Sequence, residues 1–500
     1  MTTLRKAARD VLIVAGSQLV MWVASFGFVL AQARYLGPAR FGELSLALTY
    51  AAFLSIVIDF GLGTQLSRMV AQRSTSANTA LVTTMIIRAG LWLVAAPAAW
   101  LAAVALGYDR ELQQLILILA ASVLFLGVGN TIGAYFQGQE RFVLPSVASI
   151  AQRVTAAVVG VVALVATHDL IAVTMAFVVA AIVNVGVLLY GMRFAPRAWP
   201  RVQLDEVIRL FRGAIPLGMV WIATTFYFGV DMVMLQRMAP AENVGWYAAA
   251  YRLFNAASIV PTIVAGTVLY PVLSRLSLGS RSELRVVIEK SLSFLTLSGV
   301  GVALVFVVLA DPIVALLYPA QSYAPAASAL RLLAPGLVFL YLNWVFAASL
   351  LGLHREKQLL VLTFAAAVLN PLANLVAIPL FRQEGAALTT SLTELLMLVW
   401  LVRTMPRDLV SSENLRVAAK AALAAGAAAL GVLATQEATL LVALPLAIAL
   451  YGITALALRA VQPRDLLALL SVLRPDRTAS SGVGEVVGEP ILRAATEEVR

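Results

Sequence analysis

Long apolar segments separated by short polar ones form the basic pattern of this chain. About fourteen segments approach or exceed the roughly 20 residues that an apolar helix needs to cross ~30 Å of hydrocarbon. The period-two alternation of barrel strands is absent, and lipid requires backbone groups to be satisfied within each segment, so all are predicted to be helices. The predicted spans are residues 11–33, 44–66, 81–106, 112–134, 143–166, 170–192, 214–236, 246–270, 291–310, 327–350, 359–380, 386–402, 417–434 and 438–458.

Lys and Arg are concentrated in alternate gaps between these spans. The N-terminus and the loops after spans two, six, eight, ten and twelve are basic, whereas the intervening loops hold few or no basic residues. Cytoplasmic loops carry an excess of positive charge. Both termini are therefore predicted to be cytoplasmic, and the number of spans is predicted to be even.

The composition supports a membrane protein and excludes several kinds of chemistry. Of the 500 residues, 61% are hydrophobic and only 12% are charged, which is too little polar character for a soluble protein of this size. We attribute the net charge of +10 to cytoplasmic loops and anionic lipid, not to nucleic-acid binding. The chain has no cysteine, and its two histidines, His168 and His354, lie in loops predicted on opposite sides of the membrane. A thiol catalyst, a histidine metal site and a Ser-His-Asp triad are therefore not expected.

The two halves of the chain carry similar landmarks in the same order. Each half has an arginine at the end of its first span and a glycine eight residues later, then Leu-Ser-Arg after its second span and a glycine after its fourth. The landmarks are Arg34, Gly42, 66–68 and Gly138 in the first half, and Arg237, Gly245, 273–275 and Gly352 in the second. Because six is even, spans one and seven cross in the same direction, so the two repeats are predicted to be parallel.

The predicted fold class is an all-α polytopic membrane protein with about fourteen transmembrane helices. Two parallel-repeat six-helix lobes would enclose a central cavity that rocking opens to either side, and two extra C-terminal helices would follow them. The predicted domains are an N-terminal six-helix lobe (1–192), a basic cytoplasmic linker (193–213), a C-terminal six-helix lobe (214–405), two additional transmembrane helices (406–460) and a mostly disordered cytoplasmic tail (461–500), with a short amphipathic stretch at 465–473.

Ionisable residues inside the predicted spans are the first candidates for function. A charge in hydrocarbon costs at least ~2.5 kcal/mol, so it must face protein or water. Arginine binds phosphate through bidentate, charge-assisted hydrogen bonds, so the basic residues predict a cationic cavity for an anionic substrate. Structural ion pairing, for instance of Asp59 with Arg88, is the alternative. The candidates are Arg88, Arg153 and Arg252 for substrate binding, and Asp59, Asp231 and Glu394 for ion coupling or pairing.

Amide side chains in or near the spans extend the same two interpretations. Interhelical hydrogen bonding is the more common role of such residues. A cavity for a sugar chain would also need donors and acceptors of this kind. The residues are Asn130, Gln137, Asn184, Asn255, Asn343, Asn370 and Asn374.

Five sequence motifs of the chain belong to a recognisable pattern. They are RYLGPARFGE at 34–43, DFGLG at 59–63, YFQGQER at 135–141, GWYAAAYRL at 245–253 and NLVAIPLFRQEGAALTTSLTE at 374–394. These motifs resemble the polysaccharide-biosynthesis flippases, the Wzx-type members of the multidrug/oligosaccharidyl-lipid/polysaccharide (MOP) exporter superfamily. The resemblance runs from residue 10 to about residue 405.

This resemblance implies flipping of an undecaprenyl-pyrophosphate-linked oligosaccharide across the bacterial inner membrane, by alternating access between two lobes, for O-antigen or exopolysaccharide synthesis. It implies that Arg88, Arg153 and Arg252 line the cationic cavity. It also implies that transport needs no bound cofactor, with H⁺ or Na⁺ coupling through the acidic residues, and that a polysaccharide polymerase is a partner.

Other functions stay open at this point. A twelve-span facilitator-type carrier is disfavoured because the loop at 67–80 lacks a Gly-Asp-Arg-rich signature, and a non-transporting scaffold is a further alternative. A lipid II flippase of the same superfamily would differ only in the sugar carried. A membrane-embedded glycan polymerase or ligase would need long translocated loops, whereas the predicted ones are short. Drug export is disfavoured because span one, residues 11–33, contains no acidic residue.

Overall fold

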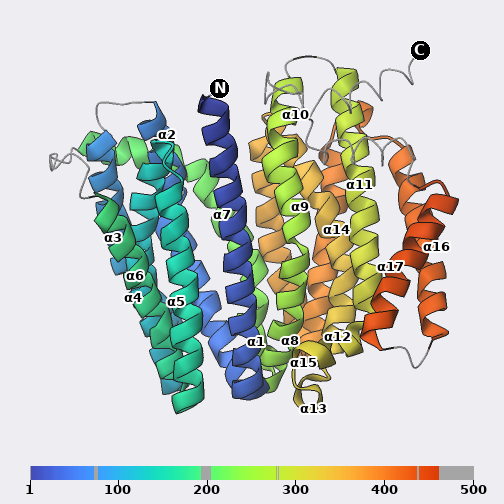
Figure 1. Ribbon diagram of the computed structural model, residues 1–500, viewed down its shortest axis with the longest axis horizontal. Coiled ribbons are helices and arrows are strands. Elements are labelled where there is room, and N and C mark those ends of the chain that lie inside the picture. The colour runs from blue at the N-terminus through green and yellow to red at the C-terminus, as the bar shows by residue number, and fades with distance from the viewer. Residues whose placement is uncertain are drawn as a thin grey trace. The chain divides into compact units, whose positions relative to one another are not determined.

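The computed structural model describes residues 2–72, 77–192, 204–277, 279, 281–435 and 439–460, and this part of the chain is helical with no strand (Figure 1). Among these residues, twelve helices are long and apolar enough to cross a membrane. Two of them each join two predicted spans across a kink: α1 (Thr2–Asp59) at Gly37 and α15 (Glu356–Thr404) at Arg382. The prediction of an all-α polytopic protein with about fourteen membrane-crossing segments is confirmed.

The chain divides into two compact units, of which unit 1 comprises Met1–Ala248 and Leu317–Ser322. Trp246 Nε1 donates a hydrogen bond to the backbone oxygen of Ser322 at 2.7 Å, which ties the second of these segments to the first. After α1, the helices of unit 1 are α2 (Leu62–Ala71), α3 (Ala77–Ala105), α4 (Arg110–Gly138), α5 (Val143–Thr167), α6 (Leu170–Met192), α7 (Leu204–Met238) and the first part of α8 (Ala241–Ala257).

Unit 2 comprises Ala249–Leu316 and Tyr323–Arg500. The π-helix η1 interrupts its first long segment, between two short α-helices. Its described elements after α8 are α9 (Ile259–Ile263), η1 (Val264–Leu269), α10 (Tyr270–Leu276), α11 (Arg281–Val308), α12 (Ala310–Leu317), α14 (Ala326–Gly352), α15, the 3₁₀ turn η2 (Arg407–Leu409), α16 (Glu413–Leu433) and α17 (Leu440–Ala457), while α13 (Ala320–Tyr323) lies mainly in unit 1.

The boundary between the units lies at Ala248, not at the predicted linker 193–213. Residues 204–213 of that linker are already part of α7. Within unit 1, α7 packs against α1, α2 and α3. The six-helix lobes stay a prediction, and residues 193–203 and 461–500, with the predicted amphipathic stretch, lie outside the described residues.

The second span of each repeat is not the single straight helix that was predicted. In place of the span 44–66, α1 ends at Asp59, Phe60 and Gly61 have left-handed φ angles of 42° and 75°, and α2 begins at Leu62. Glycine adopts such angles without a Cβ clash, whereas Phe60 is strained. In place of the span 246–270, the chain passes through α8, α9 and η1.

α7 supports the break at Phe60 from one side. The rings of Phe60 and Phe211 stack with centroids 5.1 Å apart. A Cβ on Gly218 would lie 2.7 Å from the Phe60 carbonyl oxygen, so only glycine allows α7 to approach this closely. Gln65 Nε2 donates to the Gly213 carbonyl at 2.7 Å. These contacts compensate for the strain at Phe60.

The repeat landmarks make equivalent contacts inside the two units. In unit 1, a Cβ on Gly138 would lie 2.6 Å from the Ser67 carbonyl oxygen. In unit 2, a Cβ on Gly352 would lie 2.9 Å from the Leu273 Cβ and 3.3 Å from the Ser274 nitrogen. In each unit, the end of the fourth span therefore rests on the Leu-Ser-Arg segment that follows the second span.

Candidate functional site

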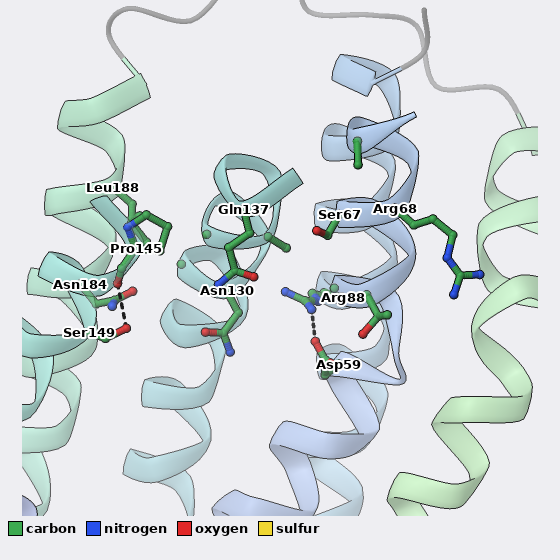
Figure 2. Close-up of a pocket in the computed structure, with 16 residues that line it drawn as sticks. Asp59, Ser67, Arg68, Arg88, Asn130, Gln137, Pro145, Ser149, Asn184 and Leu188 are labelled. Carbon is green, nitrogen blue, oxygen red and sulfur yellow. Dashed lines mark hydrogen bonds and ion pairs between the residues drawn. The ribbon is translucent and has the colours of Figure 1, made fainter. Parts of the chain in front are cut away.

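Unit 1 holds a polar cavity of about 710 Å³ between six of its helices (Figure 2). This volume is within the ~300–1,000 Å³ typical of ligand sites. Side chains from α1 to α6 line it. The lining residues are Asp59, Gly63, Thr64, Ser67, Arg68, Ala71, Arg88, Gly129, Asn130, Gly133, Ala134, Gln137, Pro145, Ser149, Asn184 and Leu188.

One face of α4 supplies much of the polar lining. Asn130, Gly133, Ala134 and Gln137 follow the i, i+3, i+4, i+7 spacing of a single helix face. Asn130 and Gln137 are exposed, and within the described part of the chain their side chains form no hydrogen bond. Both amides are therefore available to a ligand, and the two small residues between them leave the space.

An ion pair between Asp59 and Arg88 closes one side of the cavity (Figure 2). The Arg88 side chain is almost fully buried and its Nη1 donates to the Gly127 carbonyl at 2.8 Å and to Thr131 Oγ1 at 2.6 Å. Gly63 leaves room for this guanidinium, since a Cβ there would lie 3.2 Å from Arg88 Nη2. Asp59 neutralises the charge of Arg88, so the pair carries no net charge into the cavity.

Asn184 of α6 lies on the opposite side of the cavity, against α4. A Cβ on Gly129 would lie 2.2 Å from Asn184 Oδ1, so only glycine leaves space for the side-chain amide at this position. Asn184 is only 5% exposed, and its Oδ1 has no hydrogen-bond partner among the described residues. Leaving a buried amide unsatisfied costs ~1–3 kcal/mol, which marks the position as one where a partner is missing.

Of the six predicted site residues, the structure brings together Asp59 and Arg88. Arg153, on α5, is exposed, does not line the cavity, and has no ion pair or hydrogen bond with another described residue. Arg252 is half-buried and belongs to unit 2. A single cluster of the three arginines is therefore not seen within unit 1.

The other two acidic candidates are buried and hydrogen-bonded. Asp231 of α7, in unit 1, accepts a hydrogen bond from the Tyr247 hydroxyl at 2.8 Å. Glu394 of α15, in unit 2, accepts one from Asn343 Nδ2 at 2.7 Å. Both carboxylates thus have structural partners, and their coupling role stays a prediction.

Several cavity residues were not selected as site residues from the sequence. Thr64, Ser67 and Arg68 of α2 face the cavity, as does Ser149 of α5. The polar residues of α2 have the i, i+3, i+4 spacing of one helix face, which could have identified them. The spacing was overlooked because Arg68 had been assigned to a basic cytoplasmic loop. Figure 2 shows the Arg68 side chain running away from Asn130 and Gln137.

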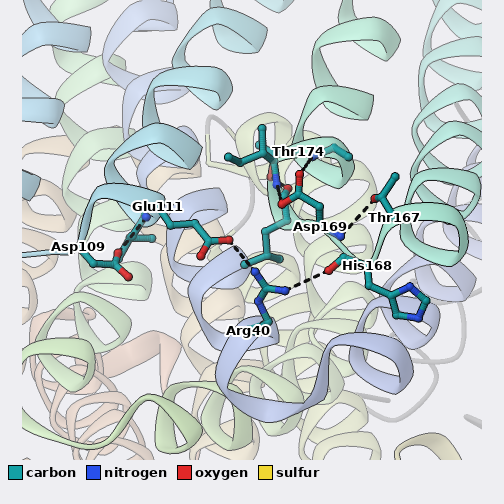
Figure 3. A network of polar contacts seen from close by, with 11 residues as sticks. Arg40, Asp109, Glu111, Thr167, His168, Asp169 and Thr174 are labelled. Carbon is teal, nitrogen blue, oxygen red and sulfur yellow. Dashed lines mark hydrogen bonds and ion pairs between the residues drawn. The ribbon is translucent and has the colours of Figure 1, made fainter.

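A polar network braces the end of unit 1 that is remote from these residues (Figure 3). Arg40 Nη2 pairs with Glu111 Oε1 at 2.7 Å, and its Nη1 donates to the His168 carbonyl at 3.0 Å. Asp109 caps α4 by accepting from the Leu112 nitrogen at 2.9 Å. The network connects α1 to the start of α4 and to the turn between α5 and α6, whereas the cavity lies near the other ends of these helices.

Tyr108, in the turn between α3 and α4, adds an aromatic contact at this end. It is 8% exposed and its ring meets Tyr50 edge to face, with centroids 6.2 Å apart. Burial, and then the neighbouring Tyr50, raises the pKa of the Tyr108 phenol. It therefore stays protonated, and its hydroxyl donates to the Val233 carbonyl of α7 at 3.4 Å.

Comparison with known protein families identifies the class of the chain. The family model described as polysaccharide biosynthesis protein matches residues 7–277, which is more than half of the 500 residues. The chain belongs to the polysaccharide biosynthesis protein family. The MatE family model also matches this family member, at residues 216–376. No curated protein sequence gives a significant match.

Solved structures support the same fold for this polysaccharide biosynthesis family member. The lipid II flippase MurJ, in an inward closed conformation, superposes with a TM-score of 0.73 at 15% identity and covers 91% of this chain and 100% of its own. An inward-facing multidrug resistance MATE family transporter gives 0.64 at 15% identity, covering 77% and 96%. The family models and the shared fold place the chain in the MOP superfamily of flippases and transporters.

Proposed function

We propose that this protein flips an undecaprenyl-pyrophosphate-linked oligosaccharide across the bacterial inner membrane for surface polysaccharide biosynthesis, by alternating access. The observation that carries the proposal is the polar cavity inside unit 1 of a polysaccharide biosynthesis family member. A glycan that crosses ~30 Å of hydrocarbon needs substitutes for the water it leaves. Amide and hydroxyl groups set among membrane-crossing helices are suitable substitutes.

Arg153 is the best candidate for contact with the anionic pyrophosphate. It lies about ten residues into α5, a membrane-crossing helix, and no described residue neutralises its charge. An arginine fork binds phosphate oxygens in pairs. Arg88 differs because Asp59 already holds it, so in this proposal it positions the cavity wall. Arg252 is a second candidate for the anion.

Coupling to an H⁺ or Na⁺ gradient is a further part of the proposal. The candidate carboxylates are Asp59, Asp231 and Glu394, and each has a described partner that donates to it. Protonation or cation binding would weaken those contacts and so bias a two-state equilibrium. Transport into proteoliposomes with and without each imposed gradient tests this, and equal rates in all cases would argue against coupling.

A lipid II flippase is the second candidate function. The observation in its favour is the fold shared with MurJ, which covers 91% of this chain. The matched families and structures are transporters and flippases, which favours transport over a glycan polymerase or ligase. The two transport functions differ in the sugar carried.

A deletion strain distinguishes the two substrates. We expect lipid-linked oligosaccharide to accumulate on the cytoplasmic leaflet and surface polysaccharide to disappear, while cell-wall synthesis continues. Accumulation of lipid II with lysis would support the second candidate. Accumulation of neither lipid would contradict both. The accumulated glycan also identifies the sugar chain, and crosslinking in the wild-type strain tests the predicted polymerase partner.

The absence of cysteine from the sequence allows a direct test of the predicted topology. A cysteine at Thr2 is expected to react only with membrane-permeant maleimide in intact spheroplasts. A cysteine at Arg110, an exposed residue between the predicted spans 81–106 and 112–134, is expected to react with an impermeant maleimide as well. The reverse pattern would overturn the predicted cytoplasmic termini.

A further inference from the structure

We propose that the cavity of unit 1 is a subsite for the uncharged, hydroxyl-rich part of the substrate, a neutral sugar unit, and not for its pyrophosphate. This inference rests on the proposed function and names what the cavity recognises. The evidence is the charge of the lining, its hydrogen-bonding groups and the buried amide of Asn184, whose Oδ1 has no partner among the described residues.

The charges of the cavity favour a neutral ligand. The positive charge of Arg88 is paired with Asp59 through Nη2, and its Nη1 donates to the Gly127 carbonyl and to Thr131 Oγ1 rather than toward the open space. Arg68 is exposed at one side and turns away from the amides of α4 (Figure 2). An anion would therefore meet little uncompensated positive charge beside Asn130.

The neutral polar groups suit hydroxyls. An amide offers both donors and acceptors, and a sugar hydroxyl does the same. Asn130 and Gln137 present unbonded amides from one face of α4, with Gly133 and Ala134 between them. The small residues let a pyranose ring approach the helix backbone. The volume of about 710 Å³ is in the range that encloses a drug-sized ligand, a class that includes a disaccharide.

Asn184 points independently to a ligand. It is 5% exposed, lines the cavity and, among the described residues, has no hydrogen-bond partner for its Oδ1. Glycine at position 129 is required for the amide to lie where it does. A buried polar group without a partner is unfavourable unless a bound molecule supplies one.

Saturation-transfer difference NMR on the purified full-length protein tests the proposal with three neutral disaccharides: maltose, lactose and chitobiose. We expect transfer to at least one of them. Asn184→Leu and Asn130→Leu are each expected to weaken binding roughly tenfold, because each removes hydrogen bonds to the sugar. Asn130 is exposed, so its variant keeps the test informative if Asn184→Leu fails to fold.

The matched control is Gln114→Leu, which removes an exposed amide from the same helix at the end remote from the cavity and should bind as the wild type does. Added inorganic pyrophosphate should not displace the sugar. Displacement by pyrophosphate, absence of transfer to all three sugars, or binding by both asparagine variants as tight as that of the wild type would each overturn the subsite. None of these results affects the deletion-strain test, so a failed subsite leaves the proposed function standing.

Discussion

The two units bend their second spans in different ways. In unit 1 the span breaks at Phe60 and Gly61, next to Asp59, which is paired with Arg88. In unit 2 the corresponding region passes through the π-helix η1, Val264–Leu269, which has no charged residue. Interruptions of both kinds often lie at functional sites. Both units thus interrupt the helix of their second span, but among the described residues only the interruption in unit 1 lies beside an ion pair.

The fourth and sixth spans show the same contrast. In unit 1, Asn184 lies over Gly129, and in the part of the chain that the structure describes its Oδ1 has no partner. In unit 2, Asn343 of α14 donates to Glu394 of α15 at 2.7 Å. The crossing of unit 2 pairs an amide donor with a carboxylate, although Asn343 Oδ1 also has no partner among the described residues. The crossing of unit 1 has no such pair within its described residues, and its Asn184 lines the cavity. The two units therefore share the arrangement of their helices, whereas the polar cavity is formed by residues of unit 1.

Loss of the buried ion pair of unit 1 should have the largest effect of the variants compared. Arg88→Gln leaves the Asp59 carboxylate without its partner, so we expect loss of transport and a drop of about 3 kcal/mol in the free energy of unfolding. This is the lower end of the usual range because the Asp59 side chain is 36% exposed. Unfolding in SDS and a vesicle flipping assay measure the two effects.

Two variants control this prediction. Asp59→Asn combined with Arg88→Gln removes both charges and should recover most of the lost stability. Arg331→Gln breaks the exposed pair with Asp311 in unit 2, whose side chains are 39% and 67% exposed, and should cost less than about 1 kcal/mol. Equal costs for the two arginines would refute the contrast between a buried and an exposed pair.

Arg153 tests whether an unpaired arginine behaves differently from a paired one. Arg153→Gln removes a charge without a described partner, so the free energy of unfolding should change by no more than about 0.5 kcal/mol. Transport in the deletion strain should nevertheless be lost if Arg153 contacts the pyrophosphate. Full transport by this variant, at normal expression, would remove Arg153 from the proposed mechanism.

The glycine contacts test the frame that both units share. Gly138→Ala and Gly352→Ala each place a Cβ within 3.0 Å of a neighbouring atom, so each should lower the free energy of unfolding by ~1–3 kcal/mol. Gly186→Ala, on α6, meets no atom within 4 Å and should be stabilising by ~0.5–1 kcal/mol because alanine favours the helix. An unchanged free energy of unfolding for only one of Gly138→Ala and Gly352→Ala would show that the contacts of the two repeats are not energetically equivalent.

The network at the far end of unit 1 should contribute least. Arg40→Met removes a half-exposed pair with Glu111 and one bond to the His168 carbonyl, so we expect a loss of at most about 1 kcal/mol and retained transport. Arg110→Met, an exposed neighbour, is the control and should be neutral. A loss of transport with Arg40→Met at unchanged stability would give this end a role that we do not expect.

The sequence predicted the membrane-crossing segments well because lipid imposes one simple requirement on each of them. Runs of apolar residues near 20 in length become helices, and the kinks at Gly37 and Arg382 separate spans that the sequence had already separated. The break at Phe60 was missed. Gly61 alone does not signal it, since its cause includes the approach of α7 at Gly218, which is distant in the sequence.

The site was only partly predictable for a similar reason. Depth and charge singled out Asp59 and Arg88, and their pairing was foreseen as an alternative. Asn184 was recognised as polar, but its unsatisfied amide depends on a helix crossing with Gly129 that no local pattern encodes. Arg252 was grouped with Arg88 by sign, whereas the fold places it in unit 2.

The helix break before the cavity has a consequence for how this protein can diversify. The turn at Phe60 and Gly61 is specified by backbone angles and by its contacts with α7. The amides of Asn130 and Asn184 project from unbroken stretches of α4 and α6. In the proposed sugar subsite, selection can therefore change these amides without disturbing the bend, so that related chains can share one helix break and differ in the sugar that they bind.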